Sequence, residues 1–403
     1  MLSPEDVRAA RERIGDRVVH TPVEYSNTFS SLTGGEVYLK CEQFQRTGAF
    51  KLRGATNRIA TLPAEDRETG IVTASAGNHA QGVALAAARA GVDATVVMPE
   101  YAPISKVHAT EGYGGRVVLY GLNYAEAQAR AHDLEREEGR FYLDAFDDPD
   151  VMAGQGTIGL EILEDVPEVD TVVVPIGGGG LISGIATALS GADAAVRVVG
   201  VQAEGAASLP DALKKGERVE LDAVDTIADG IAVSRVGERT FETIRERVDE
   251  VVTVSDPEIA RAITALLERS KTLAEGAGAA PLAALIESKF EVAEGETVVP
   301  VISGGNIDPN VLTTVLMRGL IQSGRYLRIR TVLKDRPGTL QELTSVIAEN
   351  RANIYGIQHD RTARDIGMSS AEVELDLETR GHDHVDRLID ALEDSGYPVE
   401  VLV

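Results

Sequence analysis

The chain has 403 residues, a length that predicts two or three domains. Its net charge of −25 argues against nucleic-acid binding, and no stretch approaches the run of about 18 apolar residues that a membrane span needs. Cys41 is the only cysteine, which excludes intramolecular disulfides and cysteine metal clusters. Because the acidic N-terminus also lacks the apolar core of a secretory signal, we expect a cytoplasmic protein.

The charged residues are unusual in kind as well as in number. Only 8 of the 39 basic residues are lysines. An acidic surface with arginine favoured over lysine suggests adaptation to high salt, where repulsion between like charges is screened. An ordinary acidic cytosolic enzyme is the alternative interpretation.

The first 320 residues predict an α/β fold. Ser3-Pro4-Glu5 has the composition of a helix start. Strands are predicted at 37–40, 71–73, 94–98, 117–119, 171–176, 196–202 and 297–302. Helices are predicted at 78–90, 104–111, 124–138 and 182–189. Apolar strands that alternate with helices indicate parallel sheets covered on both faces.

We expect this part to form two lobes. The first run of the alternating pattern, residues 45–150, predicts a small lobe, and residues 1–44 and 151–325 predict a larger one. The pattern changes near Gly324. Strands at 327–333, 353–358, 371–377 and 399–403 and helices at 339–349 and 384–394 then give the order βαββαβ. Residues 327–403 therefore predict a separate ferredoxin-like domain.

A single lysine stands out in the stretch Thr47-Gly48-Ala49-Phe50-Lys51-Leu52-Arg53-Gly54. In apolar surroundings the pKa of Lys51 would be lowered, and its free amine could form a Schiff base with a carbonyl, above all with pyridoxal phosphate (PLP). A surface lysine at a helix start is the alternative, and this stretch alone does not decide between the two.

A second motif, residues 75–82 with the sequence SAGNHAQG, follows the predicted strand at 71–73. Ligands bind at the carboxyl ends of parallel strands, and small residues let backbone amides approach an anion such as a substrate carboxylate. Asn78 adds an amide that could donate to a phenolate oxygen. An N-capped turn with His79 as an ordinary helix residue is the alternative.

Four glycines follow the strand at 171–176 and precede the helix at 182–189. Gly177, Gly178, Gly179 and Gly180, with Leu181, leave bare amides at a helix N-terminus, which favours a phosphate. The run supplies neither the GxGxxG dinucleotide pattern nor a Walker loop. A tight turn is the alternative.

A third strand end carries Ser303-Gly304-Gly305-Asn306. The Ser303 hydroxyl could meet a pyridine nitrogen and would leave it mostly unprotonated, which weakens the ring as an electron sink and suits eliminations. Another glycine turn is the alternative. Because four such features on strand ends are unlikely to be independent, we interpret them as parts of one site.

These four motifs, in this order, resemble the threonine and serine dehydratases of the tryptophan-synthase-β family of PLP enzymes. The resemblance covers residues 1–320 and implies a fold type II PLP core that converts L-threonine to 2-oxobutanoate and ammonia, with L-serine as a slower substrate. It implies that Lys51 holds PLP and acts as general base. It also implies that Phe50 packs beside the ring, Asn78 bonds the ring hydroxyl, Gly177 to Leu181 hold the phosphate and Ser303 the nitrogen, and that Ser75, Gly77 and His79 seat the substrate carboxylate.

Two departures from related enzymes bear on the activity. Serine racemases carry a serine where this chain has Ala76, so a second base is missing and racemisation is disfavoured. The same relatives bind a divalent ion through a glutamate that aligns with Gln202, so no such metal is expected here, while a monovalent cation is left open. The alternatives are a serine dehydratase or racemase and, from another class, an amino-acid sensor with a non-catalytic core.

Residues 327–403, with Asp335-Arg336-Pro337-Gly338, resemble an ACT regulatory domain. The resemblance implies that isoleucine or valine binds near Gly338 and Asn353 and that subunits pair into a homodimer or homotetramer. A structural module without an effector is the alternative.

Overall fold

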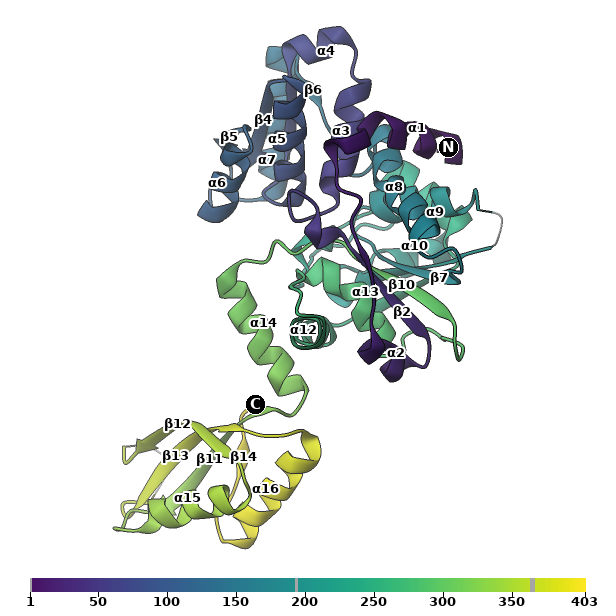
Figure 1. The fold of residues 1–403 in the computed structure, drawn as a ribbon. Helices are drawn as coiled ribbons and strands as arrows, with labels where there is room; N and C mark the ends of the chain where they lie inside the picture. The colour runs from purple at the N-terminus through teal and green to yellow at the C-terminus, as the bar shows by residue number, and fades with distance from the viewer. Residues whose placement is uncertain (1, 193–194, 363–366) are drawn as a thin grey trace. The chain divides into compact units, whose positions relative to one another are not determined.

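The computed structural model describes residues 2–192, 195–362 and 367–403. The chain divides into two compact units, Met1–Asp308 and Pro309–Val403 (Figure 1). The α/β fold class predicted from the sequence is confirmed. No helix among the described residues combines the length and the apolar character that crossing a membrane requires.

The first unit contains a six-stranded sheet with the order β1-β2-β10-β7-β8-β9. Its neighbouring strands are parallel except β1, which pairs antiparallel with β2. The strands are β1 (Val23–Tyr25), β2 (Glu36–Cys41), β7 (Thr171–Pro175), β8 (Arg197–Ala203), β9 (Glu250–Val254) and β10 (Thr297–Ile302).

A second sheet of the first unit has the order β5-β4-β3-β6, and all of its strand pairs are parallel. Its strands are β3 (Ile71–Ala74), β4 (Ala94–Met98), β5 (Arg116–Leu119) and β6 (Phe141–Tyr142). The helices of this unit are α1 (Pro4–Ile14), α2 (Asn27–Thr33), α3 (Lys51–Thr61), α4 (Ala64–Thr69), α5 (Asn78–Ala90), α6 (Ile104–Gly112), α7 (Tyr124–Glu138), α8 (Pro149–Asp165), α9 (Gly180–Leu189), α10 (Leu209–Lys215), α11 (Glu238–Arg247), α12 (Asp256–Ala265) and α13 (Gly276–Ile286).

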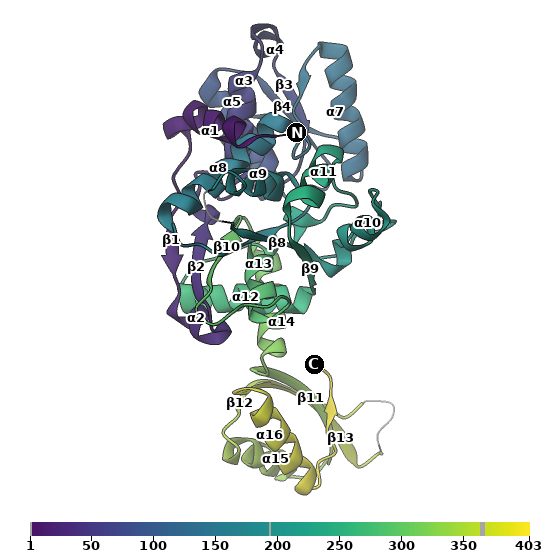
Figure 2. The same ribbon diagram turned by 90° about the vertical axis from the view of Figure 1, so that its right-hand side faces the viewer.

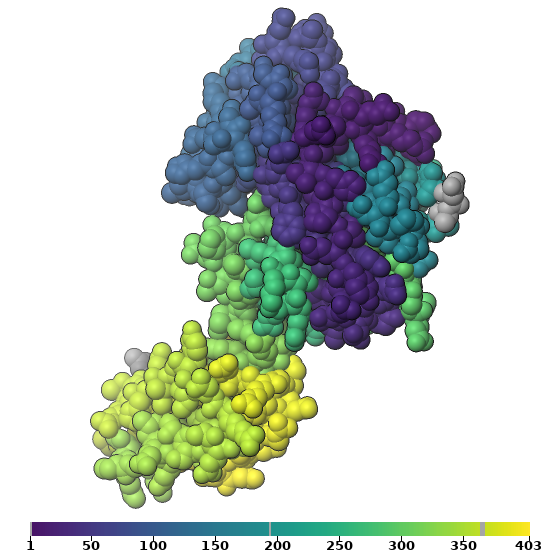
Figure 3. Space-filling model, viewed as in Figure 1, coloured from purple at the N-terminus to yellow at the C-terminus, as the bar shows by residue number. Residues whose placement is uncertain are grey.

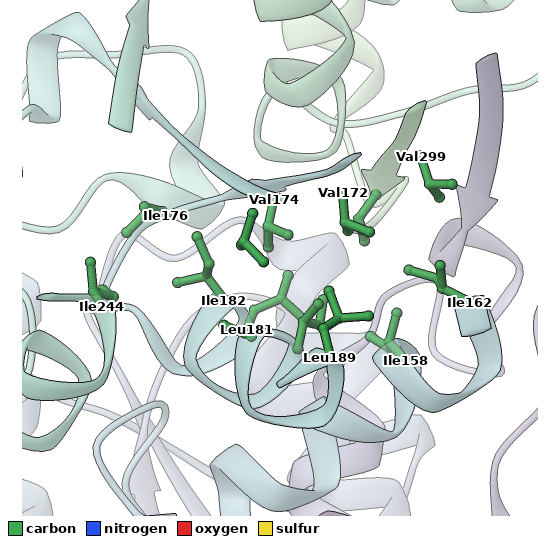
Figure 4. Packing of buried hydrophobic residues seen from close by; sticks show 14 of the residues in the cluster. Ile158, Ile162, Val172, Val174, Ile176, Leu181, Ile182, Leu189, Ile244 and Val299 are labelled. Atoms are coloured by element: carbon green, nitrogen blue, oxygen red, sulfur yellow. The ribbon is translucent and has the colours of Figure 1, made fainter. Parts of the chain in front are cut away.

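Helices cover both faces of each sheet, as the apolar strand pattern predicts. In Figure 2, α8 and α9 lie on one side of the six-stranded sheet and α12 and α13 on the other, while α7 and α5 flank the second sheet. The larger core lies between α8, α9 and the strands β7, β8 and β10 (Figure 4). Its inward side chains include Ile158, Ile162, Val172, Val174, Leu181, Ile182, Leu189 and Val299.

The N-terminal segment lies on the surface of the first unit, where it appears in purple in Figure 3. Its helix α1 begins with a capping box, because the Ser3 side chain accepts from the amide of Asp6 and the Asp6 carboxylate accepts from the amide of Ser3. Pro4 occupies the first turn, so the predicted helix start is confirmed.

The second unit consists of α14 (Pro309–Gln322) and a four-stranded antiparallel sheet with the order β12-β13-β11-β14. Its elements after α14 are β11 (Tyr326–Lys334), α15 (Thr339–Glu349), β12 (Asn353–Asp360), β13 (Ser370–Glu378), α16 (His382–Asp394) and β14 (Glu400–Val401). Leu343 and Leu388 of the two later helices join Ile329 and Leu375 of the sheet in one buried cluster. The predicted βαββαβ order is present.

Candidate active site

We expected all four motifs at strand ends, but only three closely follow a strand, because a short turn at Glu42–Phe44 separates the lysine stretch from β2. Ser75 comes directly after β3, Ser303 directly after β10, and Gly177 two residues after β7. Since β7 and β10 are parallel neighbours in one sheet, their carboxyl ends share an edge. This edge is where ligands of open α/β sheets bind.

The lysine stretch packs against the segment that follows β10. The amide of Phe50 donates to the carbonyl oxygen of Ser303 at 3.1 Å, and the amide of Gly305 donates to that of Gly48 at 2.9 Å. Gly48 has a φ of +72°, and a Cβ there would lie 2.3 Å from the side-chain oxygen of Asn306. The close approach of these two segments therefore depends on glycine at position 48.

Lys51 is the first residue of α3, and its side chain is half-buried. Its Nζ donates to the carbonyl oxygen of Ala145 at 3.0 Å and lies 5.3 Å from the centre of the Phe50 ring. Burial lowers the pKa of Lys51 to about 8, although the nearby carboxylates of Asp144 and Glu275 act in the opposite direction. Roughly a tenth of this lysine is therefore a free amine at pH 7 and about half at pH 8, and the free amine is the form that attacks a carbonyl.

Asn78 is the first residue of α5, and both the nitrogen and the oxygen of its side-chain amide form hydrogen bonds. Its Nδ2 donates to Glu275 Oε1 at 2.6 Å, and its Oδ1 accepts from Asn306 Nδ2 at 2.8 Å. Burial raises the pKa of Glu275 to about 7, and the hydrogen bond from Asn78 opposes this rise. The sequence analysis missed Glu275, because a lone acid before an alanine-rich helix carries no recognisable pattern.

The four glycines form the turn into α9, which starts at Gly180. Gly179 caps this helix with a φ of +95° and without a side-chain hydrogen bond, so the first amide groups of α9 are available to an anion. A Cβ at Gly178 would lie 2.3 Å from the Phe146 ring, and one at Gly180 would lie 2.7 Å from the Phe146 carbonyl oxygen. The loop is therefore tightly packed as well as rich in bare amides.

The segment that contains Ala145 and Phe146 connects the glycine loop to Lys51. Phe146 packs against Gly178, and its neighbour Ala145 accepts the hydrogen bond from Lys51. Phe50 in turn donates to Ser303, and Asn78 accepts from Asn306. These contacts together join all four predicted motifs into one cluster.

The remaining predicted residues of the second motif differ in exposure. Ser75 and Gly77 are half-buried, and the Ser75 hydroxyl accepts from the Gly77 amide at 3.2 Å. His79 is 3% exposed, and its Nε2 lies 3.4 Å from the carbonyl oxygen of Leu143. Burial, together with the charge of Lys51, lowers the pKa of His79 to about 3, so the imidazole is neutral. Contact with a substrate carboxylate stays a prediction for all three.

Gln202, at the position where the sequence predicts no divalent metal, has both ends of its side-chain amide hydrogen-bonded to the backbone. Its Nε2 donates to the carbonyl oxygen of Ala206 at 3.3 Å, and its Oε1 accepts from the amide of Leu209 at 2.9 Å. Within the described residues, no group of three or more histidine, cysteine or acidic side chains is arranged to hold a metal ion.

Residues 14–304 match the sequence profile of the family described as pyridoxal-phosphate dependent enzymes. The chain belongs to this family. Residues 324–396 match the ACT domain, so both parts of the predicted resemblance are confirmed.

Relatives of known name cover the whole chain. It is 50% identical over 402 residues to an L-threonine ammonia-lyase of Geobacter sulfurreducens and 46% identical over 402 residues to one of Thermotoga maritima, in each case across 100% of both chains. Among solved structures, the maize serine racemase superposes with a TM-score of 0.75 at 36% identity, covering 79% of this chain and 98% of that one. The core is thus similar both to deaminating enzymes and to a racemase.

The residues of the cluster fit PLP, the cofactor of this family. Lys51 supplies an amine with a lowered pKa, and α9 begins with bare amides at glycines that cannot carry side chains against Phe146. Asn78 supplies an amide and Ser303, 1% exposed, a hydroxyl at the end of β10. Amine, anion-binding amides and ring partners are the donor set that this cofactor requires.

Proposed function

We propose that the chain deaminates L-threonine to 2-oxobutanoate and ammonia with PLP as cofactor, and L-serine to pyruvate more slowly. The observation that carries the proposal is the cluster in which Lys51, Asn78, the Gly177–Gly180 loop and Ser303 meet. The L-threonine ammonia-lyase name of the two relatives that span the whole chain supports the choice of substrate.

In this proposal Lys51 would hold the cofactor through Nζ, and the amides at the start of α9 would hold its phosphate. Asn78 would donate to the ring hydroxyl, Ser303 would contact the ring nitrogen and Phe50 would pack beside the ring. When bound, PLP supplies an electron sink that makes the Cα proton of an amino acid removable.

When the amino group of the substrate takes the place of Nζ on the cofactor, Lys51 Nζ would be released as an amine and would take this Cα proton as general base. Ser75, Gly77 and His79 orient the substrate carboxylate, with the neutral His79 acting as a hydrogen-bonding group rather than as a cation. Ala76 offers no proton donor or acceptor in its side chain. Elimination of the β-hydroxyl is therefore favoured over return of a proton to the other face.

Product analysis tests the proposed reaction. The purified chain with PLP should convert L-threonine at the roughly 1–10³ per second that is usual for enzymes, form pyruvate from L-serine more slowly and form no D-serine. Chiral chromatography and detection of the oxoacids would measure all three. Release of D-serine faster than pyruvate would instead identify a racemase. A chain that turned over no amino acid and showed no absorbance of bound PLP would fit the alternative of an amino-acid sensor.

We further propose that the ACT domain regulates this activity by binding isoleucine or valine. The two residues predicted for the effector, Gly338 and Asn353, flank α15, whose 11 residues span roughly 16 Å. A small amino acid cannot reach both ends within one copy. A site that uses both residues would therefore lie between two copies, in keeping with a homodimer or homotetramer.

A titration tests the regulation. Isoleucine or valine should change the turnover of the full chain, and a chain ending at Asp308, the boundary of the first compact unit, should keep turnover but lose the response. A parallel titration with AMP shows whether a nucleotide, rather than a branched-chain amino acid, changes the turnover. An unchanged isoleucine response in the shortened chain would place the effector site in the first unit.

We also propose that the protein is located in the cytoplasm and that its acidic, arginine-rich composition is an adaptation to high salt.

A further inference from the structure

Three side chains form a hydrogen-bonded relay across the candidate active site. Asn306 Nδ2 donates to the carbonyl oxygen of Thr47 at 2.7 Å and to Asn78 Oδ1 at 2.8 Å. Asn78 Nδ2 donates onward to Glu275 Oε1 at 2.6 Å. The relay thus connects the lysine stretch, the strand end after β10 and the start of α5 with the residue that precedes α13.

The direction of every bond in this relay is fixed by its two ends. A backbone carbonyl and an ionised carboxylate only accept hydrogen bonds, so while Glu275 is ionised both amides between them must donate toward the ends. Both N–H groups of Asn306 are used, on Thr47 and Asn78. Asn78 uses one N–H on Glu275 and keeps the other. If the Asn78 amide were flipped, its oxygen would face the Glu275 carboxylate.

The surrounding backbone leaves room for this carboxylate. The amide of Glu275 donates to the carbonyl oxygen of Gly304 at 3.0 Å. A Cβ at Gly304 would lie 2.5 Å from Glu275 Oε1, so only glycine allows the carboxylate to lie there. Glu275 also stands at the N-terminus of α13, where the helix dipole favours a negative charge.

We infer that Glu275 is a positioning residue for the proposed reaction: it fixes the Asn78 amide so that the free N–H of Asn78 is presented to the ring hydroxyl of the cofactor. This inference rests on the proposed PLP chemistry. It assigns to Glu275 a role that acts through Asn78 rather than through contact with the substrate.

The charge state of Glu275 links this role to pH. The charged groups that face it are Lys51 of α3, Lys106 of α6 and Asp229, and Lys106 Nζ lies 3.7 Å from Asp229 Oδ2. Burial raises the pKa of Glu275 to about 7, with the Asn78 hydrogen bond as the largest opposing cause. Below this pH the carboxyl becomes protonated and can itself donate, so it no longer imposes one orientation on Asn78.

The test replaces the carboxylate by an amide of the same shape. In Glu275→Gln the dissociation constant of PLP should rise about tenfold, because a charged hydrogen-bond partner is exchanged for a neutral one that fits either orientation of Asn78. The pH dependence of the absorbance of bound PLP should also lose its transition near pH 7. Glu275→Asp, which keeps the charge, should regain part of the affinity. Glu287→Gln at the other end of α13 is the matched control and should leave both readouts unchanged.

Two results would overturn the inference. One is a PLP dissociation constant and an absorbance-pH curve in Glu275→Gln that equal those of the parent protein. The other is a fall in the thermal unfolding midpoint of cofactor-free Glu275→Gln large enough to account for the weaker binding, since that would make Glu275 a purely structural residue. Failure of the parent protein to deaminate threonine would refute the proposed function instead, because PLP binding and its spectrum are measured without substrate.

Discussion

Lys51→Ala should lower the deamination of threonine by at least about 10³-fold and remove the absorbance of the covalently held cofactor. The change deletes both the attachment point and the proposed general base. A small primary amine added to the solution should restore part of the turnover, because the shortened side chain leaves space next to the Phe50 ring and the carbonyl oxygen of Ala145. Steady-state rates with and without the added amine measure the effect.

Lys214→Ala is the matched control for Lys51, because Lys214 lies on α10 with a side chain that is 78% exposed. It should have the rate and spectrum of the parent protein. In the cofactor-free protein the free-amine form of Lys51 grows as pH rises through about 8, so the rate at which added PLP becomes attached to the parent protein should rise across the same range. Threonine turnover by Lys51→Ala within tenfold of the parent, without added amine, would refute the role of Lys51.

The four motifs of the candidate site can be recognised in the sequence because each is local. Helices α7 and α15 and strand β10 have the bounds expected from their apolar pattern. The glycine run at 177–180 and the small residues around Asn78 follow strands that the same pattern reveals. Such motifs can be recognised without knowing what packs against them.

Other parts of the site depend on contacts between distant residues and have no local pattern. Asn78 and Glu275 are 197 positions apart, and only the fold shows that they share a hydrogen bond. Helices α8 and α13 were not predicted, because they are rich in apolar and small residues on all sides and lack a clear 3.6-residue periodicity. The two-lobe division of residues 1–325 stays a prediction, as do the roles of individual site residues.

Arg53 is a further residue whose importance the sequence does not reveal. It stands two positions after Lys51 in α3, and its side chain is completely buried. The guanidinium donates to both carboxylate oxygens of Glu42 at 2.8 and 2.9 Å and to both of Glu161 at 2.6 and 2.8 Å. Lys40 Nζ, also buried, donates to Glu161 at 2.6 Å. Burial alone would lower the pKa of Arg53, but the carboxylates of Glu42 and Glu161 have the larger effect and raise this pKa above its usual value.

Arg53→Met should lower the free energy of unfolding by roughly 3–5 kcal/mol, because it leaves two buried carboxylates with only one lysine. Urea unfolding of the cofactor-free protein measures this loss. Arg8→Met is the control: the Arg8–Glu5 pair is exposed, with a distance of 2.8 Å, and its loss should change stability by less than about 1 kcal/mol. A similarly small change in Arg53→Met would mean that the buried network contributes no more than a surface pair.

The pH dependence of Arg53→Met distinguishes an electrostatic cause from lost packing. Burial alone would raise the pKa of Glu161, but Arg53 and Lys40 outweigh it and hold the pKa below its ordinary value. In the parent protein the ionised Glu161 therefore stabilises the fold at pH values above the pKa that Glu161 has in the unfolded chain. This stabilisation is lost as pH falls through the lowered pKa of the folded state. Without Arg53 the pKa of Glu161 should move upward, so the stability deficit should be largest at neutral pH and shrink as the solution is acidified. A deficit that stayed constant with pH would assign the loss to packing of the long side chain rather than to its charge.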